Sequence, residues 1–267
     1  MPDVVIAGAA GRMGSRLVAL LQEERGLRLV GALEAPGHPA LQKDAGEVAG
    51  IGRVNVPITG DPDGVLGPGR ILIEFSVPEA SLAHLRAVAR QRGRAVIGTT
   101  GFSAAQRQEI EGLAQEAAVL LSPNMSVGVN VAFRVLREMA RLLGDDYDVE
   151  IAEVHHRFKK DAPSGTALRM AEVVAQALGR DLTRTAIYGR HGMPGERTRS
   201  EIGILSQRSG DVVGEHTVSF GALGERLELT HRAHSRDTFA RGALRAARFI
   251  AEAEPGLYSM QDVLGLA

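Results

Sequence analysis

The sequence predicts an α/β protein: a parallel sheet with helices on both faces, followed by an α+β domain. Two observations support this. Over the first half of the chain, short apolar segments typical of buried strands alternate with helical patterns, as in consecutive βαβ units. Beyond about residue 126, a long helical pattern precedes segments in which apolar and polar residues alternate. Such alternation is typical of a mixed or antiparallel sheet with one covered face.

In the first half, the predicted strands are 3–8, 27–34, 70–76, 95–101 and 118–124, separated by predicted helices at 15–24, 79–92 and 103–117. Residues 37–69 are rich in Gly and Pro, and they predict loops. No internal repeat interrupts this order.

The second half begins with a predicted helix at 130–144 and a strand at 148–156. Further elements are a helix at 164–178, strands at 184–190, 198–206, 211–220 and 225–232, a helix at 236–254 and a short tail. The covered faces of the last two strands are expected to carry His216, Val218 and Phe220, and Leu227, Leu229 and His231. We expect one domain over 1–126, to which 236–267 returns, and a second over 127–235.

Composition limits the function classes. The 267 residues have a net charge of −1, which gives no general attraction to nucleic acid or anionic lipid. The absence of cysteine excludes disulfides, thiol nucleophiles and thiolate metal sites. The N-terminus does not resemble a signal peptide, and no apolar run approaches the roughly 20 residues of a membrane span. We expect a soluble, cytoplasmic protein with neither a nucleic-acid nor a membrane partner.

A glycine motif lies between the first predicted strand and helix. Gly8, Gly11 and Gly14 in "GAAGRMG" permit a tight turn, close approach of the backbone to a pyrophosphate and close helix packing. Glu34 ends the next strand, 20 residues after Gly14, where an acid can bind a ribose hydroxyl. The spacing is GxxGxxG, not the commoner GxGxxG, and the alternative is a glycine turn without a ligand. In this context, the motif favours a nicotinamide dinucleotide.

Two further loops follow predicted strands. "GTTG" (98–101) and "SPNMSVGVN" (122–130) lie where open parallel sheets bind ligands, beyond the carboxyl ends of the strands. Each could be a simple turn, but both are placed to line the nicotinamide end.

A basic cluster occurs in "EVHHRFKKDAPSGTA", residues 153–167. Histidine suits proton transfer near neutral pH, and Lys159 supplies a cation and a proton donor. Ser164 is a plausible helix N-cap, so the amides of Gly165 and Thr166 would lie in the first turn and point at a carboxylate. The cluster predicts a small acidic substrate.

The basic residues also allow a metal site or a nucleic-acid surface. Adjacent histidines have poor chelating spacing, so no metal is expected. A second basic set, Arg184, Arg190, His191, Arg197, Arg199 and Arg208, is scattered, which favours surface or subunit contacts over nucleic acid.

The segments "VVIAGAAGRMGSRL", "VIGTTGF", "SPNMSVGVN", "EVHHRFKKDAPSGTA" and "GDVVGEHTVSF" together resemble the 4-hydroxy-tetrahydrodipicolinate reductase (dihydrodipicolinate reductase) family of the diaminopimelate route to lysine. The resemblance implies a Rossmann domain for NADH or NADPH, and a second domain that binds a cyclic dicarboxylate and forms a homotetramer. In the implied reaction, a hydride formally replaces a hydroxyl that leaves as water.

The resemblance also implies site residues. His155 matches the acid/base and Lys159 the proton donor, while His156, Gly165 and Thr166 match substrate contacts, with Ser164 beside them. The matches to cofactor contacts are Gly8, Ala9, Ala10, Gly11, Arg12, Met13, Glu34, Gly98, Thr99, Thr100, Ser122, Pro123, Asn124 and Met125.

Two residues depart from the family pattern. Ala35 replaces an arginine that follows the acid in some members, which predicts a preference for NADH over NADPH. Met125 stands where some members have Phe, which should alter packing near the nicotinamide. The alternatives are another two-domain dehydrogenase, acting on an amino acid or aldehyde, and a nucleotide-sensing regulator. The His155/Lys159 pair argues against the regulator, because a sensor needs no proton donor there.

Overall fold

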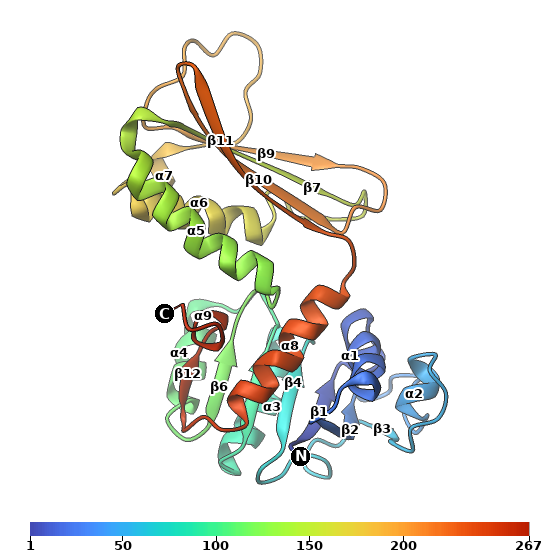
Figure 1. Cartoon of the computed structure of the whole chain (residues 1–267). Coiled ribbons are helices and arrows are strands. Elements are labelled where there is room, and N and C mark those ends of the chain that lie inside the picture. The colour runs from blue at the N-terminus through green and yellow to red at the C-terminus, as the bar shows by residue number, and fades with distance from the viewer. Residues whose placement is uncertain (267) are drawn as a thin grey trace. The chain divides into compact units, whose positions relative to one another are not determined.

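The computed structural model describes residues 1–266, which form two compact units. The first comprises Met1–Val127 and the segment from Arg236 onward, and the second comprises Gly128–Ser235. Figure 1 shows the secondary-structure elements of each unit.

The first unit contains a seven-stranded parallel sheet in the order β12-β6-β5-β4-β1-β2-β3. Its strands are β1 (Asp3–Ala7), β2 (Arg28–Leu33), β3 (Ile58–Thr59), β4 (Ile71–Glu74), β5 (Arg94–Ile97), β6 (Ala118–Leu121) and β12 (Gly256–Tyr258). Its helices are α1 (Arg12–Glu23), α2 (Ala45–Val48), α3 (Pro78–Arg90), α4 (Ala104–Leu113), α8 (Asp237–Ile250) and α9 (Met260–Val263). The predicted parallel α/β fold is confirmed.

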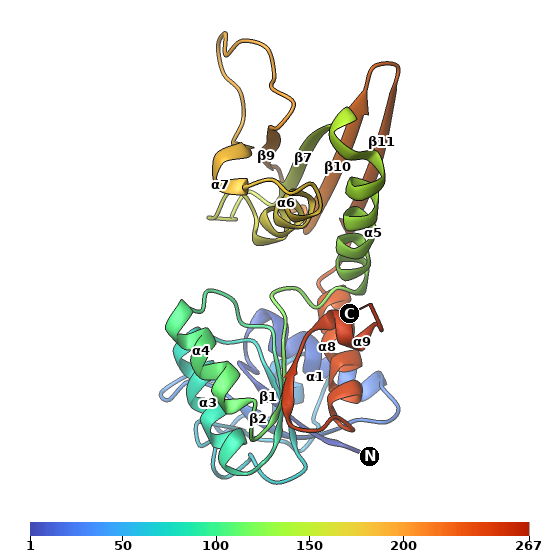
Figure 2. The same ribbon diagram turned by 90° about the vertical axis from the view of Figure 1, so that its left-hand side faces the viewer.

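Helices cover both faces of this sheet (Figure 2), because alternate residues of each strand point to opposite sides. On β1, Val4 and Ile6 join the core under α1 and α8, whereas Val5 and Ala7 join the core under α3 and α4. The strand residues in both cores are buried, which explains why the strands are almost continuously apolar.

The direction of the strand order reverses at the centre of the sheet. From β1 the chain proceeds through β2 to β3 on one side, and from β4 through β5 to β6 on the other. The loops after β1 and β4 therefore flank the topological switch point, where open α/β sheets bind ligands. A Cβ at Gly8 would lie 3.1 Å from the carbonyl oxygen of Phe75, so these two loops are in close contact.

Several details of the first unit differ from the prediction. Helix α1 begins at Arg12, three residues early, because the third glycine of the motif is helical. The loop-rich segment 37–69 contributes the short helix α2, capped by Asp44, and the edge strand β3. The predicted tail forms β12, which pairs in parallel with β6, and α9. These elements are short and depend on tertiary pairing, so local patterns did not predict them.

The second unit contains a five-stranded mixed sheet in the order β11-β10-β7-β9-β8. Its strands are β7 (Asp148–His155), β8 (Ala186–Ile187), β9 (Ile202–Arg208), β10 (Gly214–Ala222) and β11 (Glu225–Ala233). Its helices are α5 (Val127–Leu143), the 3-10 turn η1 (Gly144–Asp146), α6 (Gly165–Ala177) and α7 (Leu182–Thr185). The predicted α+β character is confirmed.

Side chains of α5 and α6 share a core with one face of this sheet, as predicted for the alternating strands. His216, Val218 and Phe220 of β10 are buried as expected. The expectation for β11 is wrong at Leu227, which is 47% exposed, because β11 is an edge strand of the sheet. The predicted strand 184–190 shrinks to β8, because Asp181 caps the helical turn α7 in front of it.

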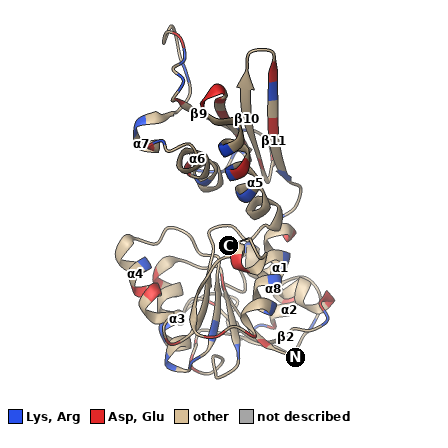
Figure 3. Cartoon of the chain, turned by 60° about the vertical axis from the view of Figure 1, so that its left-hand side comes forward, with Lys and Arg blue, Asp and Glu red and all other residues tan. Residues whose placement is uncertain are grey.

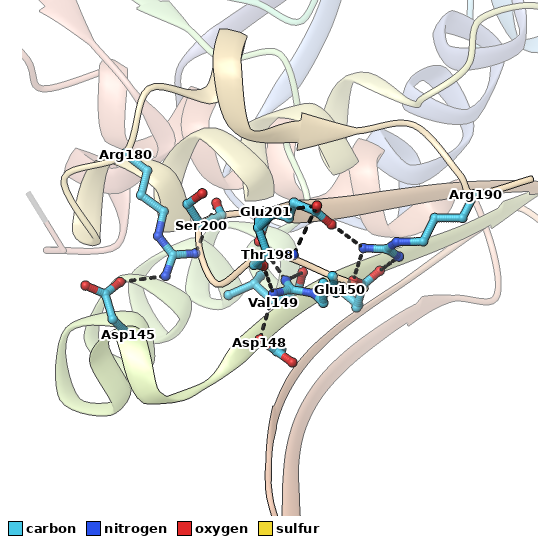
Figure 4. Close-up of polar contacts among 10 residues, drawn as sticks. Asp145, Asp148, Val149, Glu150, Arg180, Arg190, Thr198, Ser200 and Glu201 are labelled. Carbon is cyan, nitrogen blue, oxygen red and sulfur yellow. Dashed lines mark hydrogen bonds and ion pairs between the residues drawn. The ribbon is translucent and has the colours of Figure 1, made fainter. Parts of the chain in front are cut away.

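Acidic and basic positions are interspersed in both units (Figure 3), in keeping with the net charge of −1. An ion-pair network fastens the segment after β8 to β7 (Figure 4). Arg190 binds Glu150 at 2.8 Å and Glu201 at 3.0 Å, and Arg197 binds Asp148 and Glu150. Over residues 1–266, no helix has the length and apolar character needed to cross a membrane.

Candidate functional site

The loop after β1 turns sharply into α1. Gly8 has a φ of +70°, which glycine adopts freely, and the Gly11 N–H donates to the Gly8 carbonyl at 2.9 Å. A Cβ at Gly14 would lie 2.6 Å from the Ala9 Cα and collide with the Gly8 carbonyl oxygen. The first glycine is thus required by backbone conformation and the third by close packing of α1 on the turn.

Glu34 lies beside this loop. Its Oε2 accepts the Ala10 N–H at 3.0 Å, and its Oε1 accepts the Ala35 N–H at 3.0 Å. The carboxylate that was predicted to bind a ribose is therefore next to the glycine turn that was predicted to bind a pyrophosphate.

A cavity of about 640 Å³ opens beside these residues, a size typical of a small-molecule site. It is lined by Gly8, Gly11, Glu34, Ala35, Pro36, Gly60, Pro62, Asp63, Phe75, Ser76, Val77, Ala80, Ala83, His84, Ala87 and Arg90. A glycine-rich backbone, a carboxylate and an apolar wall at one cavity fit the adenosine and pyrophosphate of a dinucleotide.

The other predicted cofactor residues lie nearby in the same unit. Gly98–Thr100 and Ser122–Met125 follow β5 and β6, whose carboxyl ends face the same edge of the sheet as that of β1. A Cβ at Gly98 would overlap the Phe75 ring, which lines the cavity. Thr99 is buried, and its hydroxyl bonds that of Ser81 at 2.7 Å. These loops border the cavity region without lining it, and Arg12 is exposed at the start of α1.

Two ionisable residues of this cavity region were missed from the sequence. Glu74 is completely buried at the end of β4, and it accepts the Ser76 N–H at 3.0 Å. Its other oxygen is 2.7 Å from Nδ1 of His84, which lines the cavity. An acidic residue inside the apolar run "RILIEFS" was the available signal, since a buried carboxylate needs partners.

The second unit brings the histidine cluster together at the end of β7. Val149, Ile151, Glu153 and His155 alternate onto the covered face of this strand. Glu153 is 0% exposed and His155 is 9% exposed. A carboxylate and an imidazole thus occupy positions where the pattern requires apolar side chains.

Several segments donate to the Glu153 carboxylate. Its Oε2 lies 2.6 Å from the His155 Nδ1, its Oε1 accepts the Ser164 N–H at 3.1 Å, and Arg208 binds both oxygens at 3.0 Å. Burial alone would raise the pKa of Glu153, but hydrogen bonds from His155, Ser206 and Arg208 outweigh it and hold the pKa below its usual value. The carboxylate is therefore ionised at neutral pH.

His155 and Lys159 differ in their surroundings. Burial lowers the pKa of His155, the Glu153 carboxylate partly offsets this, and the Lys159 and Arg208 charges lower it further. The imidazole is thus largely neutral at pH 7. The Lys159 ammonium binds the Asp161 carboxylate at 2.8 Å, and its side chain is 19% exposed. His156 lies just past the strand, and its Nδ1 is buried without a hydrogen-bond partner in the described structure.

Helix α6 begins beside Glu153 and His216. The prediction that Ser164 is its N-cap is confirmed, because its Oγ accepts the Ala167 N–H at 3.1 Å. Gly165 and Thr166 form the first turn, where helix amides favour an anion. Ser164 Oγ is also 2.9 Å from Nε2 of His216. Burial lowers the pKa of His216 to about 3, so this histidine is neutral at pH 7.

Sequence reasoning missed three members of this cluster. Glu153 was part of the quoted segment, but its inward position on the strand was overlooked. His216 was treated only as an alternating core residue, although its ring is 5.1 Å from that of His155. Arg208, predicted only to make surface or subunit contacts, has a partly exposed side chain that also binds the buried Glu153 across neighbouring strands.

Among the described residues, no group of three or more His, Cys, Asp or Glu side chains is placed to hold a metal ion.

Two family profiles match the chain. The one described as "Dihydrodipicolinate reductase, N-terminus" matches residues 2–125, and the one described as "Dihydrodipicolinate reductase, C-terminus" matches residues 128–264.

The chain is similar to curated proteins over its full length. A 4-hydroxy-tetrahydrodipicolinate reductase of Syntrophus aciditrophicus is 55% identical over 265 residues, which cover 99% of both chains. That of Citrifermentans bemidjiense is 53% identical over 266 residues, which cover 100% of both. Among solved structures, the dipicolinate-bound dihydrodipicolinate reductase of Paenisporosarcina sp. TG-14 has a similar fold. Its TM-score is 0.74 at 24% identity, over 98% of both chains.

Proposed function

The chain belongs to the dihydrodipicolinate reductase family, and from this premise we propose how its residues carry out the family's reaction. The protein is an NAD(P)H-dependent oxidoreductase that reduces 4-hydroxy-tetrahydrodipicolinate to tetrahydrodipicolinate with loss of water, in the diaminopimelate route to lysine. One NAD(P)H and one proton are consumed, and NAD(P)⁺ and water are released for each substrate reduced.

The observation that carries the active-site proposal is the cluster around His155. One short stretch of chain supplies a largely neutral imidazole, a lysine and the first turn of α6, a helix of 13 residues. Together they offer a proton donor, a proton acceptor and an anion-binding helix start. This combination suits an acidic substrate whose reduction requires proton transfer.

We assign the roles within this cluster as follows. His155 acts as the acid/base, and Lys159 delivers a proton as the hydroxyl leaves as water. Lys159 is paired with the Asp161 carboxylate at 2.8 Å, and its charge acts on His155. His156, Ser164, Gly165 and Thr166 bind the carboxylates of the substrate. The dipicolinate bound to the Paenisporosarcina enzyme is, like the proposed substrate, a cyclic dicarboxylate.

The glycine cavity of the first unit is proposed to bind the dinucleotide, and a bound reduced nicotinamide supplies the hydride. The glycine turn and α1 receive the pyrophosphate, and Glu34 exchanges its bonds to the Ala10 and Ala35 amides for bonds to the adenosine ribose. Loops Gly98–Thr100 and Ser122–Met125 hold the remainder of the cofactor.

NADH is proposed as the preferred cofactor, with NADPH also used. The carboxylates of Glu34 and Asp63 both line the cavity and would repel a 2′-phosphate. The guanidinium of Arg90 is also there, but it lies 3.6 Å from the Asp63 carboxylate. Ala35 offers no charge to the phosphate. A cytoplasmic location and a homotetramer assembled through the second unit complete the proposal.

The function is tested by following NADH oxidation with substrate generated in place by the preceding synthase. NADH oxidation should require the synthase, both of its substrates and this protein. NADPH should be oxidised more slowly than NADH in the same mixture. The assignment would be refuted if NADH were oxidised without the synthase product. It would also be refuted if the complete mixture showed no NADH oxidation. An amino acid or simple aldehyde supplied instead tests the rival dehydrogenase activities.

A further inference from the structure

One buried carboxylate connects the principal parts of the proposed active site. Glu153 has no solvent exposure, and its two oxygens serve different segments. Oε2 is 2.6 Å from the His155 Nδ1, while Oε1 accepts the backbone N–H of Ser164 at 3.1 Å. The same group therefore contacts the proposed acid/base and the N-cap residue of α6.

This carboxylate is costly to bury. Its neighbours on the same face of β7, Val149 and Ile151, are core residues, and an apolar side chain at 153 would continue their pattern. A charge in such a place is tolerated only when it is paired and hydrogen-bonded. Arg208 supplies the pairing with both oxygens at 3.0 Å. The cost indicates a requirement for the carboxylate itself.

The hydrogen bond between Glu153 and His155 fixes which ring nitrogen of His155 carries the proton. An ionised carboxylate can only accept, so the Nδ1 of His155 must carry the proton. The neutral ring then presents an unprotonated Nε2 on its opposite side. A histidine oriented in this way has one defined tautomer and a restricted ring angle.

Arg208 extends the same connection to the lysine segment. Besides binding Glu153, its guanidinium donates to the backbone carbonyl of Asp161 at 2.6 Å. Asp161 in turn holds the Lys159 ammonium. The histidine, the lysine segment and the helix start are thus all attached to the Glu153–Arg208 pair.

We infer that Glu153, supported by Arg208, is a positioning residue that holds His155 in the Nδ1–H tautomer, with Nε2 as its reacting atom, and fixes the start of α6 beside it. This inference rests on the proposed function, because it assigns His155 the acid/base role. Glu153 itself does not touch the substrate. It acts through the ring and the helix start that it holds.

The test uses Glu153→Gln in the full-length protein. Oε1 accepts from the Ser164 N–H and from both Arg208 terminal nitrogens, whereas Oε2 accepts from one Arg208 nitrogen besides His155. The amide oxygen should therefore remain at Oε1, and the NH₂ should face His155. Nδ1 must then accept, and the proton moves to Nε2. We expect kcat to fall about 10- to 100-fold, while NADH affinity stays as in the wild type.

The pH profile supplies a second readout. The charged or titratable groups facing His155 are Glu153 on its own strand, Arg208 on β9, His216 on β10 and Lys159 in the following loop. Of these, only Glu153 raises the pKa of His155. In Glu153→Gln the carboxylate charge is lost, so the pKa of His155 should fall. The acidic limb of the kcat/KM profile should therefore move to lower pH. A residue that only stabilised the fold would leave this limb in place.

Glu150→Gln is the matched control. Glu150 lies on the same strand and also binds two arginines, but its ion pairs are with Arg190 and Arg197 and it does not contact His155. The same chemical change there should leave kcat, the pH profile and the ring nitrogens of His155 unchanged. Equal effects of the two substitutions would overturn the inference.

The wild-type protein gives a test that does not depend on whether a variant folds. Ring ¹⁵N shifts of neutral His155, assigned by comparison with His155→Asn, should show a protonated Nδ1 and an unprotonated Nε2. The opposite tautomer would overturn the inference even if the enzyme is fully active. If the wild type instead fails to oxidise NADH with the synthase product, the proposed function fails, whatever the tautomer is.

Discussion

The two units build their proposed sites by different means. In the first, the binding surface is mainly backbone, since Gly8 and Gly14 shape the turn and even Glu34 is held by main-chain amides. In the second, the site is made of side chains, where Glu153, His155 and Arg208 meet inside a sheet. A backbone site tolerates no added atoms, whereas a side-chain site depends on charge and protonation. Substitutions in the two sites should therefore have different effects.

The largest expected effect is at the side-chain site. His155→Ala and Lys159→Ala should each lose about 10²- to 10⁴-fold in turnover, the usual contribution of positioned proton transfer. NADH binding, measured by fluorescence titration, should be retained, because the proposed dinucleotide cavity is lined by other residues. A double variant with near-normal turnover would show that this cluster is not catalytic.

The backbone site should respond to a single added methyl group. In Gly14→Ala, the new Cβ would meet the Ala9 Cα and the Gly8 carbonyl, neither of which can move without distorting the turn. We expect a loss of about 1–3 kcal/mol in the free energy of unfolding, together with weaker NADH binding.

The matched control is Gly112→Ala in α4, where an added Cβ would have no neighbour within 4 Å. It should leave NADH binding unchanged and raise the unfolding free energy by up to about 1 kcal/mol. Denaturant titration measures both variants. Equal stability of the two would mean that the turn is less tightly packed than this structure indicates.

Inhibitors test whether the second unit binds two carboxylates. A planar pyridine dicarboxylate should compete with the substrate, because one carboxylate can meet the α6 amides while the other meets the basic side chains. A pyridine monocarboxylate loses one charge-assisted interaction, worth about 1.5–3 kcal/mol, and should bind more weakly. Equal inhibition constants for the two compounds would argue against a site for two carboxylates.

The smallest expected effect concerns cofactor choice. Ala35→Arg places a planar cation next to Glu34 at the cavity, where it can bind a 2′-phosphate. An exposed pairing of this kind is worth up to about 1 kcal/mol, so kcat/KM should improve a few-fold with NADPH and less with NADH. If the unmodified protein already favours NADPH, another basic group must serve the phosphate, and Arg90 is then the first residue to substitute.

Local sequence patterns were enough to predict the features that depend on neighbouring residues in the chain. Strand and helix order in the first unit followed from apolar runs and spacing, and the cap at Ser164 followed from a short motif beside it. The C-terminal strand β12 was missed, because three residues, Gly256–Tyr258, become a strand only through pairing with β6. Its placement depends on a partner more than a hundred residues earlier in the chain.

The side-chain network was missed for the same reason. Arg208 reaches Glu153 because β7 and β9 are parallel neighbours, with Glu153 opposite Ser206 and His155 opposite Arg208. Nothing near Arg208 in the sequence indicates that pairing. Glu153 did carry a local signal, since it interrupts the inward-facing series of its strand. A charged residue on the covered face of an alternating strand is a sequence feature that merits a search for partners.

The two units are proposed to serve one reduction, in which a hydride passes from a nicotinamide to the cyclic dicarboxylate. The most direct test uses NADH carrying deuterium at the transferable C4 position, with substrate generated by the synthase and the product examined by mass spectrometry. We predict one deuterium in each molecule of tetrahydrodipicolinate formed, for each NADH oxidised. NADH oxidation that leaves the product without deuterium would contradict the account.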